Sequence, residues 1–289
     1  MKKSPSKIIF DICNYLFLGT FVAICLYPIL NQVAISFSSP AAIMSGKVTV
    51  YPMEFTTATY EGLIQQPIFW RNYQNSIMYT FLGIVLSLIM TTIASYALSK
   101  KDLFGGNVIM KFFVFTIFFG GGIIPCYALI IKLGLIDNIL AILLPNVILP
   151  YHVLIMRTYF QGIPVDLEEA SKLDGLGQFG YFIQIILPLS KPILATMTLF
   201  IAVLYWNDWF SALMYLNDQN MQPVTLYLRN AMMGSAMAAS TGDVSSGMQT
   251  IPQSLQAASM LLVIAPILCV YPFVQKYFVK GVMIGAVKG

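Results

Sequence analysis

The stretch EEASKLDGLGQFGYFIQIILPLSKP, residues 168–192, is the most hydrophilic part of the middle of a very apolar chain. It begins like a short acidic helix and is interrupted at Gly175 and Gly177. It then continues into an apolar run that is stopped by Pro188 and Pro192. The fold must therefore place a compact charged helix directly before an apolar segment.

The composition around this stretch predicts an all-α membrane protein. Hydrophobic residues make up 58% of the 289 residues and charged residues only 10%, whereas a soluble domain carries about 25% charged residues. A spanning helix needs about 20 mainly apolar residues. Such segments predict about six transmembrane helices in a single domain over residues 1–289. The predicted spans are 8–37, 72–98, 108–132, 138–160, 181–206 and 254–276.

The distribution of basic residues predicts the orientation, because cytoplasmic loops carry an excess of Lys and Arg. With the N-terminus inside, only Lys47, Arg71, Lys132 and Arg229 of the 16 basic residues lie outside. The sequence thus predicts that both termini are cytoplasmic and that the opening stretch is cytoplasmic too. Two long outer loops follow, at about 38–71 and 207–252, and GKVTVYP in the first is expected to form a short strand.

The motifs of enzymes and of ion-driven carriers are missing from the sequence. It contains no G-x-x-x-x-G-K-[ST] phosphate loop, no H-E-x-x-H and no G-x-S-x-G. The four cysteines lie in apolar runs without metal-type spacing. The interior segments also lack the acidic relay that coupled carriers bury. We expect no catalytic and no metal site, and transport would need an energy source on another chain or would be passive.

Residues 164–176 carry helix signals at both ends. Pro164 suits a first helical turn, acidic residues follow it, and Gly175 suits a C-terminal stop. At 100° per residue, Val165, Glu169, Leu173 and Leu176 share one face. A cytoplasmic helix this short needs something to pack against. Docking into the groove of a soluble partner and a plain surface linker explain this pattern equally well.

A longer pattern begins in this helix. Glu169-Ala170-Ser171, three residues, Gly175, nine residues and Ile185-x-Leu187-Pro188 resembles the EAA motif of ABC-importer permeases. The departure from that motif is Ser171, where the motif has a second alanine, a small-for-small change. The first outer loop, LYWNDWFSALMYL and the tail VQKYFVKGVMIGAVKG resemble sugar-importer permeases similar to the smaller maltose-transporter subunit. The sequence of the first outer loop resembles the permeases that import oligosaccharides from complex or acidic polysaccharides, the aldouronate type.

This resemblance implies a type I importer permease fold and an oligosaccharide substrate. It also implies the partners: a second, different permease, two ATPase subunits that hold ATP and Mg²⁺, and an extracellular solute-binding protein. This chain itself would hold no cofactor. The helix at 164–176 would be the coupling helix seated on the ATPase, and the tail would reach the same interface. The implied ATPase-coupling residues are Glu169, Ala170, Ser171, Leu173, Gly175 and Leu176, with Ala286, Val287, Lys288 and Gly289 in the tail.

Sugar sites combine aromatic faces with amide or carboxylate groups, and this suggests candidates at the end of the fifth predicted span. Trp206, Asn207 and Asp208 form such a cluster, where interfacial anchoring or binding-protein docking is the competing interpretation. Tyr151 and Phe119 are further candidates. Two other functions stay open: import of a peptide or amino acid by the same architecture, and an ion-coupled secondary carrier.

Overall fold

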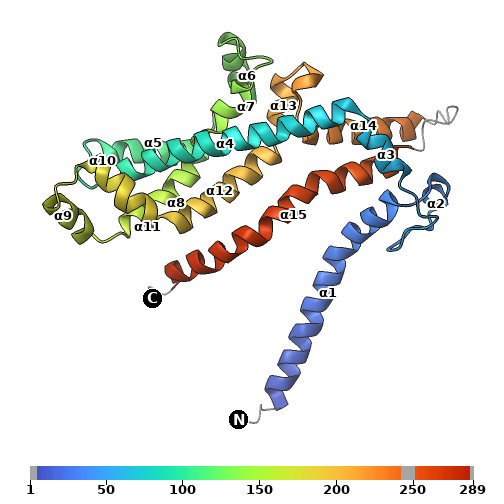
Figure 1. Ribbon diagram of the computed structural model, residues 1–289, viewed down its shortest axis with the longest axis horizontal. Helices are drawn as coiled ribbons and strands as arrows, with labels where there is room; N and C mark the ends of the chain where they lie inside the picture. The colour runs from blue at the N-terminus through green and yellow to red at the C-terminus, as the bar shows by residue number, and fades with distance from the viewer. Residues whose placement is uncertain (1–4, 242–250, 287–289) are drawn as a thin grey trace. The chain divides into compact units, whose positions relative to one another are not determined.

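The computed structural model describes residues 5–241 and 251–286, and these are mostly helical (Figure 1), with no strand among them. Turns of other helix types separate some of the α-helices. The bounds are α1 Pro5–Ser36, α2 Pro40–Met44, α3 Ala58–Ile64, α4 Pro67–Ser99, α5 Gly106–Phe118, α6 Ile123–Lys132, α7 Leu140–Leu143, η1 Leu144–Asn146, α8 Pro150–Gln161, α9 Asp166–Leu173, α10 Gln178–Tyr181, η2 Phe182–Ile186, α11 Leu187–Leu189, α12 Lys191–Trp206, α13 Phe210–Tyr215, η3 Gln219–Met221, α14 Val224–Thr241 and α15 Ile251–Ala286.

Within the described residues, three helices are long and apolar enough to cross a membrane without a break. They cover Lys7–Ser36, Pro67–Ser99 and Gln253–Val270. Three further candidates are pairs of helices bent at a short break, by 113° between α5 and α6, by 49° before α8, and by 78° between α11 and α12. Counting each bent pair as one span gives up to six spans, and these overlap the six predicted segments.

The breaks have local causes in the sequence. The chain leaves the helical path between α5 and α6 at three successive glycines, and Gly122 has φ +82°, a conformation that L side chains rarely adopt. Pro150 opens α8, and Pro192 follows the break before α12, because proline fits the first turn of a helix but not its interior. The π-helical turn η2 directly precedes α11, whose second residue is Pro188. Proline lacks the N–H group, so the ladder of backbone hydrogen bonds is interrupted there.

The chain divides into two compact units. Unit 1 comprises Met1–Phe69 and Leu228–Ala265, and unit 2 comprises Trp70–Tyr227 and Pro266–Gly289. The description of residues 1–289 as one permease domain stays a prediction. In unit 1, large apolar side chains of α1 are exposed along most of its length, as at Phe17, which is 70% exposed. Such a helix, apolar all round, suits contact with lipid or with another membrane helix.

The loop after α1 is ordered by side-chain contacts instead of the predicted strand. Phe37 stacks on Phe55 and Tyr60, with ring centroids 5.4 and 4.8 Å apart. The amide Nδ2 of Asn31 donates to the carbonyl of Thr49 at 2.7 Å. The strand expected in GKVTVYP was wrong: α-helices α2 and α3 and irregular backbone make up this loop. An isolated strand leaves its backbone groups unpaired, whereas the aromatic stack buries apolar surface locally.

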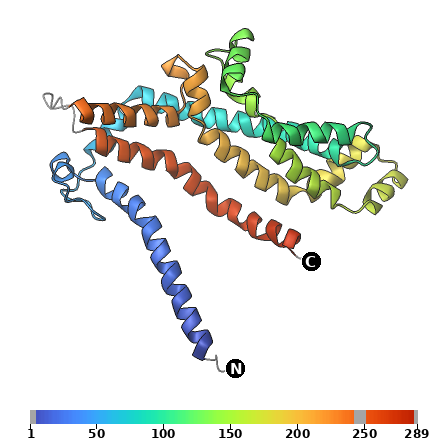
Figure 2. The same cartoon turned by 180° about the vertical axis from the view of Figure 1, so that it is seen from behind.

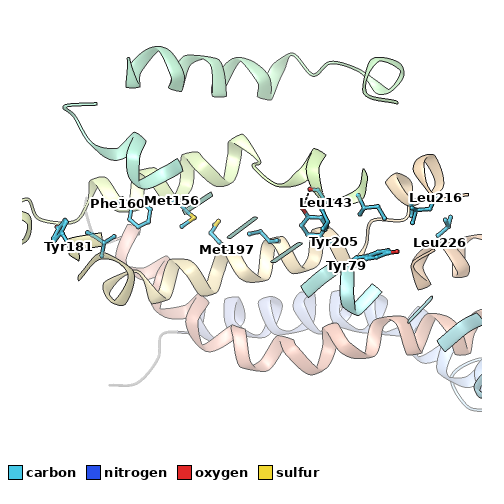
Figure 3. Packing of buried hydrophobic residues seen from close by; sticks show 13 residues of the cluster. Tyr79, Leu143, Met156, Phe160, Tyr181, Met197, Tyr205, Leu216 and Leu226 are labelled. Carbon is cyan, nitrogen blue, oxygen red and sulfur yellow. Dashed lines mark hydrogen bonds between the residues drawn. The ribbon is translucent and has the colours of Figure 1, made fainter. Parts of the chain in front are cut away.

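The core of unit 2 is a continuous row of buried side chains (Figure 3). It runs from Tyr181 at the end of α10 to Leu226 in α14, with Met156 and Met197 between them. Residues of α4, α7, α8, α12 and α13 also contribute, so the cluster joins most helices of this unit. The buried members are Tyr79, Ile142, Leu143, Met156, Phe160, Tyr181, Ile186, Met197, Ile201, Tyr205, Ala212, Leu216 and Leu226.

Tyr205 joins three helices at the centre of this core. Its hydroxyl donates to the carbonyl of Leu143 at 3.0 Å and accepts from the hydroxyl of Ser87, with the oxygens 3.1 Å apart. Its ring lies against Gly83, and a Cβ added at that glycine would overlap the ring. A hydrogen bond and a close backbone approach therefore fix α12 against α4.

The beginning of α4 holds the loop around η3. Asn75 donates through Nδ2 to the carbonyls of Asn220 and Gln222, at 2.7 and 3.1 Å. Tyr79 donates its hydroxyl to the carbonyl of Met221 at 2.6 Å, and the backbone N–H of Val224 donates to Ser76 Oγ at 2.9 Å. The loop was predicted to lie outside, and residues 72–98 of α4 were predicted to span the membrane. These contacts attach the loop directly to the third and fourth turns of α4.

Candidate functional site

The hydrophilic stretch forms α9, Asp166–Leu173, a helix of 8 residues that is shorter than the predicted range 164–176. A turn at Pro164–Val165 precedes it: the N–H of Glu168 donates to the carbonyl of Val165 at 2.8 Å. Acidic residues fill the first turn, where negative charge meets the positive end of the helix dipole. Figures 1 and 2 show α9 at one end of unit 2, next to α10.

Gly175 ends α9 in a Schellman motif. Its φ is +80°, and its N–H donates to the carbonyl of Lys172 at 3.1 Å, while the N–H of Leu176 donates to the carbonyl of Ser171 at 2.9 Å. These are the two bonds of that motif, and the left-handed residue is usually glycine. Gly177, by contrast, has φ −72° and extended backbone before α10. Of the two glycines at the predicted end of this helix, only Gly175 has a backbone conformation that requires glycine.

Replacing Gly175 with alanine is expected to loosen the end of α9. Neither Gly175 nor Gly177 has atoms within 4 Å of an added Cβ, so the two positions differ in φ and not in space. A left-handed non-glycine residue costs about 1 kcal/mol, which corresponds to roughly fivefold faster opening. Hydrogen exchange of peptide 166–176 should show that acceleration for Gly175→Ala. Gly177→Ala is the matched control, and equal acceleration in both variants would contradict the assignment.

The two sides of α9 differ sharply in exposure. Val165 is 63% exposed and Leu173 is 90% exposed, and Glu169 between them is exposed as well. Ser171 points inward with 2% exposure, and its hydroxyl donates to the carbonyl of Glu168 at 2.7 Å. That bond satisfies the extra oxygen at this departure from the EAA pattern. We call Val165, Glu169 and Leu173 the outer face of α9.

The remaining predicted coupling residues of this segment, Ala170 and Leu176, do not belong to that outer face. Ala170 is exposed, whereas Leu176 is half-buried and its side chain lies beside Gly180. The helix ends before Leu176, so continuing the helical periodicity to this residue was wrong. The polypeptide reverses at Gly175, and Leu176 turns toward the following helix. Of the predicted tail, Ala286 ends α15, while Val287, Lys288 and Gly289 lie outside the described residues.

Glu168, which the sequence did not single out, is the most strongly held acid of α9. Its Oε2 forms an ion pair with the ammonium of Lys100, and its Oε1 accepts from Lys172 at 3.2 Å and from Gln178 at 3.1 Å. The hydrogen bond from Lys100 outweighs burial and, with those from Gln178 and Lys172, lowers the pKa of Glu168 from 4.5 to about 2. This stabilisation is fully present above pH 4.5 and is lost as the pH falls toward 2.

Lys100 is held from several sides. It directly follows the last residue of α4, and its ammonium lies 4.8 Å from the ring centroid of Tyr96 and 5.2 Å from that of Tyr181, within cation–π range. Burial is the largest influence and lowers the pKa of Lys100, but the hydrogen bonds and charges of Glu168 and Tyr96 together outweigh it, so that the pKa is raised. Both partners are thus ionised at neutral pH. Arg157 of α8 also donates through Nε to the carbonyl of Leu98 at 2.8 Å.

The candidate sugar contacts lie on separate elements. Phe119 follows α5 and stacks on Phe115 with centroids 4.5 Å apart, and Tyr151 in the first turn of α8 is 63% exposed. At the end of α12, Asn207 donates to the carbonyl of Val203 at 2.9 Å. Asp208 Oδ1 accepts from the N–H of Ser211 at 3.0 Å, at the start of α13. These two polar side chains therefore have local structural partners.

Trp206 is a packing residue in this structure. It is 6% exposed, and its ring meets Tyr73 edge-on with centroids 5.9 Å apart. It also lines a cleft of about 340 Å³ between α4, α12 and the part of α15 from Pro266 onward. The lining is aliphatic and aromatic apart from Thr80 and Thr198. Such a lining lacks the amide and carboxylate groups that orient a sugar.

Among the described residues, up to six apolar spans, three of them broken, and a charged helix exposed at one end indicate a helical multi-pass membrane protein. The family model of the binding-protein-dependent transport system inner membrane component matches residues 106–284, more than half of the chain. The chain belongs to this family. It is a permease subunit of a bacterial ABC importer and a multi-pass cell-membrane protein, not an enzyme.

Individual relatives cover nearly the whole chain. Protein LplC of Bacillus subtilis is 39% identical over 289 residues, which cover 100% of this chain and 98% of LplC. The polygalacturonan/rhamnogalacturonan transport system permease protein YtcP of the same species is 36% identical, covering 97% and 99% of the two chains. A chain from the crystal structure of a bacterial ABC transporter involved in the import of the acidic polysaccharide alginate has 34% identity and a TM-score of 0.86, covering 96% of this chain and 99% of that one.

These comparisons establish the fold and the class of transport. The structure has the type I importer permease fold that the EAA pattern implied, and the chain is a carbohydrate-importer type of permease by its relatives. The family works with a second permease, with ATPases and with a solute-binding protein. Two features of α9 are therefore of interest: an outer face that this chain leaves uncovered, and an inner side that binds Lys100.

Proposed function

We propose that this chain forms half of the translocation pathway of an ATP-driven oligosaccharide importer, paired with a second, different permease. The outer face of α9 docks on a separate ATPase and passes its movement to the membrane helices. The exposure of Leu173 carries this proposal. A leucine that is 90% exposed, on a helix too short to be stable by itself, fits a groove on another protein.

The chemistry of the outer face suits a soluble partner with a basic residue. Val165 and Leu173 offer apolar side chains one turn to either side of Glu169, and all three are exposed. Docking removes the apolar groups from water and pairs the carboxylate with a cation at the rim. The aliphatic pair thereby provides affinity, while Glu169 fixes the position of α9 along the groove.

The energy source lies on the partners in this proposal. Two ATPase subunits bind ATP and Mg²⁺, and this chain, whose sequence has no phosphate loop, binds neither. Closure of the ATPase pair draws α9 toward its counterpart on the other permease. The membrane helices then open outward as rigid bodies, which is a two-state movement driven from a distant site. A solute-binding protein delivers the substrate, and the tail Ala286–Gly289 adds to the ATPase contact.

The proposed substrate class is an oligosaccharide, with fragments of acidic polysaccharides as the first candidates. The names of two similar proteins support this choice: one is a permease protein of a polygalacturonan/rhamnogalacturonan transport system, and the other belongs to an ABC transporter involved in the import of alginate. A permease at 28% identity is named for arabinooligosaccharides. The apolar cleft beside Trp206 gives no polar site for a sugar, so we place the main sugar contacts on the other permease and the binding protein.

Uptake by the complete importer tests this proposal. The chain is co-expressed with its proposed partner permease, ATPase and binding protein and is reconstituted in liposomes. We expect the four proteins to co-purify and uptake of oligogalacturonides to require internal ATP. Labelled maltooligosaccharides and a dipeptide are the comparison substrates. Uptake that continues without ATP but stops with an ionophore would contradict the importer, and uptake of the dipeptide alone would contradict the substrate class.

A further inference from the structure

The two adjacent acids at the start of α9 have different partners. Three donors from this chain surround the Glu168 carboxylate: Lys100, Lys172 and Gln178. The side chain of Glu168 is only 18% exposed, whereas Glu169 belongs to the exposed outer face. The carboxylate of Glu168 is therefore already bound by side chains of this chain. The acid that is offered to a partner and the acid that attaches α9 to the rest of unit 2 are neighbours in sequence.

The ion pair of Glu168 with Lys100 matters because α9 and α4 are not neighbours in the sequence. The polypeptide connects α9 directly to α8 before it and to α10 after it, so these helices follow its movement covalently. Lys100, in contrast, lies 68 residues from Glu168. Movement of α9 reaches the end of α4 through non-covalent contact, and the ion pair of Lys100 with Glu168 supplies such a contact.

Lys100 is well placed to pull on α4 as a unit. Its N–H donates to the carbonyl of Ala97 at 3.2 Å, which continues the last turn of α4. Its ammonium also lies over the rings of Tyr96 and Tyr181, which restricts the side chain to few conformations. A force on the ammonium is thus transmitted to the backbone of α4 with little loss through side-chain rotation.

The far end of α4 carries the loop around η3. The helix is 33 residues long without a break, which corresponds to about 50 Å. Asn75, Ser76 and Tyr79 lie in its third and fourth turns. They bind Asn220, Gln222, Met221 and Val224 of that loop or directly after it. One rigid helix therefore joins the α9 end of unit 2 to the loop that was predicted to face outward.

We propose that the Lys100–Glu168 ion pair is the joint through which α9 moves α4 and, with it, the loop at 219–224. This inference rests on the proposed function, because it takes α9 as the element that the ATPase moves. Lys100 and Glu168 are positioning residues for the transport step. They act on the pathway through α4, and Glu169 keeps the contact with the ATPase.

The test separates transport from ATP hydrolysis in the reconstituted importer. Lys100→Met and Glu168→Gln are each expected to leave co-purification of the ATPase and basal ATP hydrolysis unchanged, because the outer face of α9 is intact. Transport per ATP hydrolysed should fall roughly tenfold, within the usual range of coupling free energies. The double variant should be no worse than either single one, because the two residues act as one pair.

Two control variants keep the test independent of folding. Lys172→Met removes a bond to the same carboxylate, 3.2 Å long, but its partner lies on α9 itself, so transport per ATP should stay within twofold of the wild type. Lys100→Arg keeps the cation and should also stay within twofold, and it is the variant expected to fold if the neutral ones do not. A tenfold loss for Lys100→Arg with an intact complex would therefore overturn the joint.

Other outcomes overturn the proposal in distinguishable ways. If Lys100→Met transports normally per ATP, the ion pair plays no part in coupling, while the importer itself stands. If Lys100→Met releases the ATPase, the pair serves docking and not transmission. If the wild-type chain neither binds an ATPase nor transports with ATP, the proposed function fails, and that failure appears before any variant is made.

Discussion

Replacing Glu169 with lysine is expected to abolish uptake by the importer and its coupled ATP hydrolysis, while the chain still inserts into the membrane. The carboxylate lies on the exposed outer face of α9, so the change removes no bond that the structure shows within the chain. It places a positive charge where we propose a basic residue of the ATPase. Juxtaposed like charges at an interface cost several kcal/mol, which corresponds to at least a hundredfold loss of affinity.

The control for this variant is Asp174→Lys. Asp174 follows α9 directly and is exposed. Its replacement with lysine changes the net charge by the same amount as Glu169→Lys. It lies about 140° around the helix from Glu169, and a lysine there suits the negative end of the helix dipole. Co-purification of the ATPase and ATP-dependent uptake are measured for both variants. Normal uptake with Glu169→Lys, or equal loss with Asp174→Lys, would exclude the proposed docking face.

Replacing Gly83 with alanine is expected to destabilise the core of unit 2. The new methyl group would overlap the ring of Tyr205, and that ring has little freedom to move. Its hydroxyl is held by Ser87 of α4 and by the carbonyl of Leu143. Overpacking of this kind costs about 1–3 kcal/mol, which lowers the melting temperature by roughly 2–10 °C. Thermal unfolding of the purified complex in detergent measures the effect.

Two comparisons assign the effect to the overlap with Tyr205. Gly19→Ala adds the same methyl group inside α1, where no atom lies within 4 Å, and the higher helix propensity of alanine should leave stability unchanged or raised. Tyr205→Leu removes the ring, so adding Gly83→Ala to that variant should cost much less than in the wild type. An unchanged melting temperature for Gly83→Ala alone would contradict the close packing of α4 on α12.

These variants test two different properties, the assembly of the importer and the folding of this chain. Glu169 acts at a surface that this chain does not cover, so its replacement affects the assembly. Gly83 acts inside one packed unit, so its replacement affects folding first and transport as a consequence. Lys100 and Glu168 serve neither of these properties in our proposal, and we expect their variants to keep both the fold and the assembly while transport per ATP falls.

Several features could be predicted from the sequence because they depend on neighbouring residues. Long apolar segments located the candidate spans, since the bilayer core sets their length. Gly175 marked the end of α9, because φ preference is a property of the residue itself. The EAA spacing identified the family that the comparisons confirmed. The strand in GKVTVYP failed, since its pairing partner would have to come from elsewhere in the chain.

Only the tertiary structure decided which side of each helix is covered. The sequence singled out Glu169 and not Glu168, which the structure shows bound to Lys100. The inward turn of Leu176 after Gly175 also changed the predicted face of α9. The ion pair of Lys100 with Glu168 joins residues 68 positions apart, and the contact of Ser87 with Tyr205 joins residues 118 apart. Periodicity and spacing describe one segment at a time, whereas such pairs exist only once the helices have packed against one another.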